Sequence, residues 1–195
     1  KVILPKKLTC LPDRIFEGCA IGEIVLPGTL VVIGESAFAG CGLERIVISE
    51  GVESIGAEAF EGCARLSEVQ LPDSLKRIGG GAFEKTPWLQ GQEVAIHKNI
   101  LIAAGNKQIK SYSVPETVTV ICDRAFQDCK QLEEISLPEW LEYLGDAAFE
   151  RCYRLKGSIS IPNNVPIKRH PKVFIPKIAI PIDIIVLPKG GCVHS

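Results

Sequence analysis

A Phe-x-x-Cys motif recurs along the chain at a nearly constant interval. The motif occurs at residues 16–19, 38–41, 60–63, 126–129 and 149–152, and a sixth copy at 83–86 carries threonine in place of cysteine. The phenylalanines are 22, 22, 23, 43 and 23 residues apart. A period in the low twenties is typical of a solenoid, in which no repeat buries its apolar face without a neighbour. The sequence therefore predicts a stack of similar coils.

The copy at residues 132–152 shows the repeat unit most clearly. Leu-x-x-Ile-x-Leu at 132–137 predicts a short strand with its apolar side chains inward, and Pro138 ends it because proline cannot donate to a ladder. A second extended stretch carries Leu141 and Leu144. Gly145 then provides the conformational freedom that a tight corner needs, and the following Ala-Phe-x-x-Cys segment is predicted to form one helical turn.

The interval of 43 residues between Phe83 and Phe126 contains an insert, which we place at 84–108. Two short apolar runs flank Lys98-Asn99, which predicts a β-hairpin near 90–108. Trp88 is expected to pack the insert against the stack. Cys122 occupies the position that glycine holds in the other repeats.

We interpret the whole chain, 1–195, as one domain with regular repeats over 3–155. The pattern decays after Cys152, so residues 156–195 are expected to form a degenerate C-terminal cap that closes the open core. The chain begins Lys-Val-Ile-Leu-Pro, in the middle of a repeat and without methionine or a signal peptide, which suggests a processed chain or a piece of a longer protein.

Five of the eight cysteines hold the same position in successive repeats and are expected to form a column of small buried thiols: Cys19, Cys41, Cys63, Cys129 and Cys152. Disulfides between neighbours would need distances and Cβ directions that a parallel stack does not automatically supply. The remaining cysteines are not assigned by the repeat, and cysteine usage does not settle the cellular compartment.

No catalytic, metal or cofactor site is predicted. His97, His170 and His194 lack metal-ligand spacing with a cysteine pair. A Cys-His dyad would need its partners close only in space, so the sequence alone leaves it open. Gly79-Gly80-Gly81 lacks the Lys-Ser/Thr of a phosphate loop and falls at the corner of its repeat.

Composition argues against nucleic-acid binding and against a membrane-spanning helix. The net charge of -1 and a pI near 6.4 offer no basic face for nucleic acid. Apolar residues make up 46% of the chain, but charges and prolines interrupt every run before it reaches the length of a transmembrane helix.

The predicted partner-binding site is a surface. Alternate residues of each first strand should face outward, forming mixed, mildly acidic columns, and exposed aromatic residues are favoured interface anchors. The candidate binding residues are Glu23, Arg45, Glu68, Gln70, Ser111, Glu134, Trp140 and Tyr143. A simple solvated sheet face is the alternative explanation of the polar columns.

The frame of strand, proline, Ile-Gly and Ala-Phe-x-x-Cys resembles the BspA-like leucine-rich repeats of bacterial and protozoan surface proteins. The resemblance covers roughly residues 3–162, including the variant unit Phe83-Glu-Lys-Thr-Pro-Trp-Leu, and departs from the family at Pro12, Thr86 and Cys122. It implies an α/β-type leucine-rich-repeat solenoid with coils of about 22–23 residues, short parallel strands and one-turn helices. It also implies an extracellular or cell-surface location and an adhesive role.

Two hypotheses for function follow. The first is a non-enzymatic binding or adhesion module that engages a protein or glycan partner along the solenoid surface. The second is a structural spacer within a larger surface protein. An enzyme is the least favoured class, and neither the partner nor the oligomeric state can be read from the residues.

Overall fold

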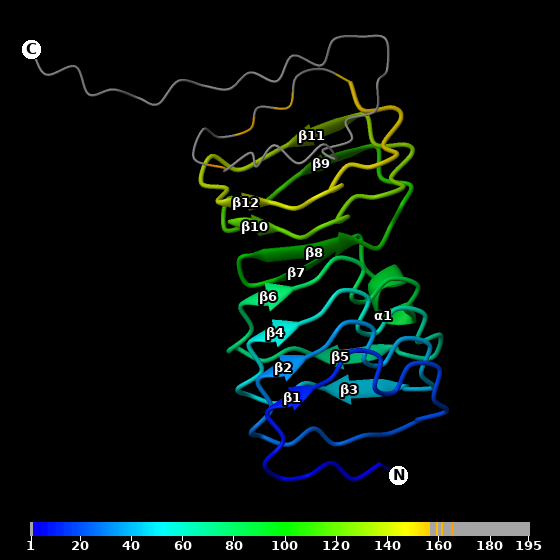
Figure 1. The fold of residues 1–195 in the computed structure, drawn as a ribbon. Coiled ribbons are helices and arrows are strands. Elements are labelled where there is room, and N and C mark those ends of the chain that lie inside the picture. Colours follow the sequence, from blue (N-terminus) through cyan, green and yellow to red (C-terminus); the bar gives the residue numbers. More distant parts are fainter. Residues whose placement is uncertain (1, 157–158, 160, 162–164, 166–195) are drawn as a thin grey trace, which may run out of the picture.

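Successive copies of the repeat form successive coils of a rod (Figure 1). The computed structural model describes residues 2–156, 159, 161 and 165. Every coil adds a short strand to a parallel ladder, because each polar backbone group in this crowded core must find a partner in the coil above or below. Helix is scarce, as Figure 1 shows: the described residues contain one helix, α1 (Pro87–Gln90).

Two rows of strands run up the stack. The second extended stretch of each repeat builds a parallel sheet in the order β1-β2-β4-β6. These strands are β1 (Cys10–Leu11), β2 (Val32–Ile33), β4 (Ser54–Ile55) and β6 (Arg77–Ile78). The first extended stretch builds two separate parallel pairs, β3 (Arg45–Val47) with β5 (Glu68–Gln70) and β9 (Ser111–Ser113) with β11 (Glu134–Ser136).

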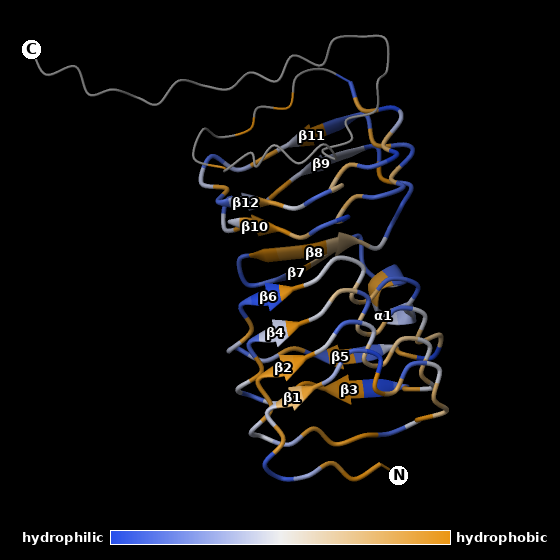
Figure 2. Ribbon diagram, viewed as in Figure 1, coloured by the Kyte–Doolittle hydropathy of each residue, from blue (hydrophilic) through white to orange (hydrophobic). Residues whose placement is uncertain are grey.

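The predicted hairpin is confirmed. Strands β7 (Val94–His97) and β8 (Ile100–Ala104) pair antiparallel, and β8 pairs in parallel with β10 (Val120–Ile121) of the next coil. With β12 (Tyr143–Leu144) they form a sheet in the order β12-β10-β8-β7. The hairpin thus takes the place of one coil, and neither β7 nor β8 hydrogen-bonds to β6 in the described sheets. All five residues of β8 are buried, which Figure 2 shows as an apolar strand across the stack.

The predicted helical turn around each Phe-x-x-Cys is wrong. The segment forms tight turns, in which each cysteine N–H donates to the carbonyl of the phenylalanine three residues earlier, as Cys41 does to Phe38 at 3.1 Å. Residues two before and two after each phenylalanine have positive φ, which an α-helix does not tolerate. Ser36 and Gly40 are one such pair, with φ of 52° and 67°.

The corner glycines are required for a different reason than predicted. Gly56 and Gly79 do not have left-handed backbone angles, but a Cβ at these positions would lie 2.5 Å from the Glu35 nitrogen and 2.3 Å from the Ala57 nitrogen of the preceding coil. Close approach of stacked corners therefore excludes a side chain. Cys122 is tolerated in the same position because its preceding coil is the hairpin, which has no such corner.

The backbone path shows how the hairpin omits that corner. In a regular coil, Ile55 and Phe60, five residues apart, pair with Ile78 and Ala82 of the next coil. In the hairpin coil, Leu101 pairs with Ile121, and Ala104, only three residues later, donates its N–H to the carbonyl of Ala125. The hairpin therefore spans the same path with two fewer residues.

Stacked phenylalanines fill the core, as predicted. The rings of Phe16, Phe38, Phe60 and Phe83 follow one another with centroid separations of 5.4, 5.2 and 5.2 Å. Trp88 ends this column, its ring tilted 58° against Phe83 at 4.8 Å, so the expected packing of the insert is confirmed. The second core cluster includes Leu101 and Ala104 of the hairpin, and beyond the hairpin Phe126 and Phe149 stack in it at 5.6 Å.

The cysteine column is also confirmed, except at its N-terminal end. Cys41, Cys63, Cys129 and Cys152 are buried, whereas Cys19 is exposed. Three of the buried thiols donate to the phenylalanine carbonyl of the preceding coil, as Cys63 does to Phe38 at 3.0 Å. No disulfide joins any of the cysteines that the structure describes.

Thr86, which replaces the column cysteine in its repeat, begins the helix of the insert. Its hydroxyl accepts a hydrogen bond from the N–H of Leu89 at 3.2 Å and donates to the carbonyl of Phe83 at 2.7 Å. A threonine N-cap with proline at the first helical position is a strong helix start. The departure from the motif therefore marks the point where the insert leaves the stack.

The predicted cap at 156–195 lies almost entirely outside the described residues. Lys156, Ile159, Ile161 and Val165 are the exceptions, and the last three pack in the second core cluster. Among the described residues, no helix has the length and hydropathy needed to cross a bilayer.

Candidate functional site

The predicted binding residues lie on two different surfaces. Those of the first strands are all exposed, while the residues between them, such as Ile46 of β3, point into the core. We call these exposed first-strand residues the strand face: Arg45, Glu68, Gln70, Ser111 and Glu134. Glu23 is also exposed, next to the isolated bridge that Ile24 forms with Val2 of the preceding coil.

The strand face is not one continuous column. Arg45 pairs with Glu68, and Ser111 pairs with Glu134, but the two pairs belong to separate sheets. The insert lies between them in the chain, and Trp88 of α1 lines a shallow hollow of about 320 Å³ over β3 and β5. A second hollow of about 340 Å³ lies over β9 and β11. The insert therefore divides the predicted surface into two shorter ones.

The strand face carries one matched charge pair and one unmatched carboxylate. The guanidinium of Arg45 lies 3.8 Å from the carboxylate of Glu68 across the ladder, whereas Glu134 forms no ion pair with any residue that the structure describes. The hydroxyl of Ser136 donates to that of Ser113 at 2.8 Å. Such exposed pairs contribute little to stability. The face is therefore polar and mildly acidic.

Trp140 and Tyr143 belong to the other surface, beside the second-strand sheet. Trp140 is 67% exposed and Tyr143 is 43% exposed. Tyr143 lies in β12, where its hydroxyl donates to Asp123 Oδ1 at 3.1 Å. The outward orientation predicted for both aromatics is confirmed, but they do not share a face with Glu68 or Glu134.

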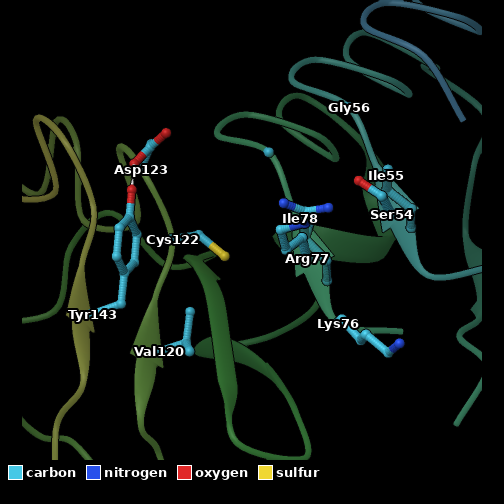
Figure 3. Close-up of a pocket in the computed structure, with 11 residues that line it drawn as sticks. Ser54, Ile55, Gly56, Lys76, Arg77, Ile78, Val120, Cys122, Asp123 and Tyr143 are labelled. Carbon is cyan, nitrogen blue, oxygen red and sulfur yellow. Dashed lines mark hydrogen bonds between the residues drawn. The ribbon is translucent and has the colours of Figure 1, made fainter. Parts of the chain in front are cut away.

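Tyr143 lines a cleft that sequence reasoning missed. The cleft, of about 510 Å³, lies where the second-strand ladder is interrupted between β6 and the coils of β10 and β12. Figure 3 shows residues of β4 and β6 on one wall, facing Val120, Cys122, Asp123 and Tyr143 on the other. We call this space the hairpin cleft. Its lining side chains that carry polar chemistry are Ser54, Lys76, Arg77, Cys122, Asp123 and Tyr143.

The triple glycine forms part of this cleft's surroundings. Gly79 touches the preceding coil, Gly81 has a φ of 70°, and Gly80 approaches across the interruption, where a Cβ would lie 2.8 Å from the Asp123 Cβ. Nearby, Arg124 Nη1 and Glu58 Oε1 form an ion pair at 2.7 Å that links the coil of β10 with the coil of β4. The structural interpretation of this glycine run is supported, and these contacts bring the two stacks together.

Two ionisable groups that line the cleft, Cys122 and Tyr143, have raised pKa values. Burial, together with the nearby Asp123 carboxylate, raises the pKa of the Cys122 thiol to about 12. Burial and the same carboxylate raise the pKa of Tyr143 to about 12. Both groups are therefore neutral at physiological pH, so Cys122 is not an activated nucleophile.

The cysteine column shows no activated thiol either. Burial raises the pKa of Cys63 and Cys129 to about 11 and that of Cys152 to about 12. His97 uses Nε2 in a 3.0 Å hydrogen bond with the carbonyl of Pro72, while His170 and His194 lie outside the described residues. Within the described ranges, no group of three or more His, Cys, Asp or Glu side chains could hold a metal ion.

The stacked parallel coils, phenylalanine column and strand-bearing repeats define a leucine-rich-repeat solenoid. The family model of the BspA type leucine rich repeat region matches residues 1–105 and 102–174, in six copies. The chain belongs to this family, as the resemblance of its repeat frame implied. Solenoids of this family are generally non-enzymatic.

Several solved structures are similar to the chain. A leucine-rich repeat protein from Bacteroides ovatus is 33% identical, with a TM-score of 0.45 over 83% of this chain and 37% of that one. A leucine-rich repeat protein from Eubacterium ventriosum is 21% identical, with a TM-score of 0.50 over 81% and 46%. A leucine rich cell surface protein from Faecalibacterium prausnitzii is 23% identical, with a TM-score of 0.45 over 83% and 47%.

The chain spans between 37% and 64% of the length of the solved structures it matches, so it corresponds to part of each. No curated protein matches it.

Proposed function

We propose that the chain is a non-enzymatic binding module that engages a protein or glycan partner along its solenoid surface, outside the cell or at its surface. The observation that carries the proposal is the alternation within each first strand. Ile46 and Val69 pack inward, while Arg45, Glu68 and Gln70 stand exposed at the regular spacing of a parallel ladder. Repeat proteins use such extended arrays to contact large partners.

The cell-surface part of the proposal draws on the family. The Faecalibacterium prausnitzii structure is described as a leucine rich cell surface protein, and another similar structure is a pneumococcal vaccine antigen. Adhesion is the role that such a location and an exposed solenoid favour.

Binding to a broad panel of extracellular-matrix proteins and glycans tests the proposal. We expect at least one partner whose affinity falls about tenfold or more in the double charge reversal Glu68→Lys/Glu134→Lys. Reversal of Glu142, which is exposed beside β12 and away from the strand face, is the matched control and should leave that affinity unchanged. A panel without any binder would contradict the proposal.

A structural spacer is the second candidate function. Its support is the rod formed by stacked coils, together with the chain's correspondence to only part of longer relatives. The charge matching of Arg45 with Glu68 also suits a face that stays solvated. Partner binding by a longer protein that survives both charge reversals, but is lost when the coils are shortened, would favour the spacer.

A further inference from the structure

The wall of the hairpin cleft includes an open sheet edge. Arg77 N–H donates to the Glu53 carbonyl and Gly79 N–H to the Ile55 carbonyl, so both face β4. Because alternate residues of a strand bond to opposite sides, the N–H and carbonyl of Ile78 face away from β4. No strand in the described sheets pairs with that edge. The cleft therefore presents backbone hydrogen-bonding groups that a ligand can satisfy.

Arg77 supplies the cleft with a free cation. The other arginines that the structure describes all form ion pairs, but Arg77 forms none there. Its neighbour Lys76 is held by Glu53 at 2.8 Å, so it is already neutralised. Figure 3 shows Arg77 on the β6 wall, across the cleft from Tyr143. A guanidinium without an ion-pair partner is suited to a bidentate hydrogen-bonded pair with a carboxylate.

The opposite wall offers a fixed aromatic ring and a carboxylate oxygen. Asp123 Oδ1 accepts hydrogen bonds from the Tyr143 hydroxyl and, at 2.8 Å, from the Asp146 N–H. These bonds hold the partly exposed ring in place. Asp123 Oδ2 has no hydrogen-bond partner among the described residues, so it can accept from a ligand hydroxyl.

We propose that the hairpin cleft binds a carboxylate-bearing sugar residue of a glycan. This inference rests on the proposed function and names its ligand class. The sugar carboxylate pairs with Arg77, a ring hydroxyl donates to Asp123, and the apolar side of the sugar ring packs on Tyr143. The volume of about 510 Å³ lies within the range of small-ligand sites and suits one or two sugar units.

The charge balance favours this ligand over a phosphorylated one. Arg77 is the one uncompensated cation lining the cleft, and Asp123 places a negative charge on the opposite wall. A phosphate group carries between one and two negative charges at neutral pH, which is more than one guanidinium neutralises, and the excess charge would be repelled by Asp123. A single carboxylate surrounded by hydroxyls matches one guanidinium and one acceptor oxygen.

The test uses two acidic probes, trigalacturonic acid and 3′-sialyllactose, each compared with its methyl ester, which keeps the sugar but removes the charge. Calorimetry with the chain should show binding of at least one acid that is tenfold or more tighter than its ester. Arg77→Gln should abolish that difference. Arg14→Gln, exposed in the coil of β1 and outside both the strand face and the hairpin cleft, is the matched control and should retain it.

Tyr143 provides a second readout. Tyr143→Phe keeps the ring and should retain most of the affinity, while Tyr143→Leu should lose tenfold or more. Thermal midpoints of all variants separate loss of binding from loss of folding, because Arg77 and Tyr143 are exposed side chains.

The proposal is overturned if both acids bind no better than their esters, or if Arg77→Gln binds as tightly as the parent chain. A partner from the broad panel whose binding depends on Glu68 and Glu134 but not on Arg77 would support the proposed function and contradict the assignment of the cleft as its binding site. A protein or peptide partner that depends on Arg77 and is not displaced by either acid would likewise contradict the glycan assignment.

Discussion

Replacing Phe60 by alanine should be one of the most destabilising single substitutions in the chain. Phe60 has no exposed surface and stacks on Phe38 at 5.2 Å with an interplanar angle of 10°, and on Phe83 at 5.2 Å with an angle of 1°. Truncation of a buried phenylalanine to alanine costs about 3–5 kcal/mol in total. Aromatic pairs contribute about 0.5–1.5 kcal/mol each, and two stacks place Phe60 in the upper part of that range, so the free energy of unfolding should fall by about 4–5 kcal/mol.

Phe16 is the matched control at the end of the same column. It is only partly buried and stacks on a single ring, Phe38, at 5.4 Å. Phe16→Ala should therefore cost about half as much or less, because it loses one stack and leaves a cavity open to solvent. Urea unfolding followed by circular dichroism measures both values. Equal losses for Phe16 and Phe60 would refute the idea that stacking between coils, and not each repeat alone, supplies the stability.

Two further substitutions test local features of the coil by the same unfolding assay. Gly56→Ala should lower the free energy of unfolding by at least about 2 kcal/mol, because its Cβ would lie 2.5 Å from the Glu35 nitrogen. The control Gly28→Ala, with open space around the Cβ, should change it by less than about 0.5 kcal/mol. A harmless Gly56→Ala would mean that stacked corners can separate. Thr86→Ala should lower the free energy of unfolding by about 1–2 kcal/mol, because the hydrogen bond from Leu89 is lost. Thr86→Ser keeps the hydroxyl and should retain most of that stability. Equal effects of the two substitutions would show that the cap does not stabilise the insert.

The stack could be predicted from the sequence because every coil repeats the same environment. Phe38, Phe60 and Cys63 hold equivalent positions in equivalent surroundings, so one interpretation applies to all of them. The hairpin was predictable for a local reason, since two apolar runs flank a Lys98-Asn99 turn. In each case the residues that decide the structure are close in sequence or related by the period.

The tight turns could not be predicted in the same way. Positive φ falls on Ser36, Glu58 and Arg124, which are residue types without any special preference for that conformation. The stack imposes it: the N–H of Glu58 donates to the Gly80 carbonyl of the next coil, and that of Arg124 to the Asp146 carbonyl. An isolated Ala-Phe-x-x-Cys segment has no such partner, so a helical turn was the reasonable but incorrect expectation.

The corner glycine illustrates a related ambiguity. Glycine at a fixed repeat position is compatible both with a left-handed backbone and with close approach of another chain, and sequence alone does not distinguish them. Cys122 does distinguish them, because it follows the cornerless hairpin coil and has a side chain where the other repeats have glycine. Cys122 also lines the cleft, so this exception marks the level of the stack at which the cleft lies.

The cleft itself depends on segments that are distant in sequence. Arg77 and Tyr143 face one another only because the hairpin replaces a full coil between β6 and β10. Between regular coils, the ladder spacing of about 4.8 Å leaves shallow grooves that a solvated side chain fills. The hairpin coil lacks one corner and two residues of backbone, and the cleft lies at that level of the stack. An interruption of the repeat is thus the natural position for a small-ligand site in a fold whose regular surface suits large partners.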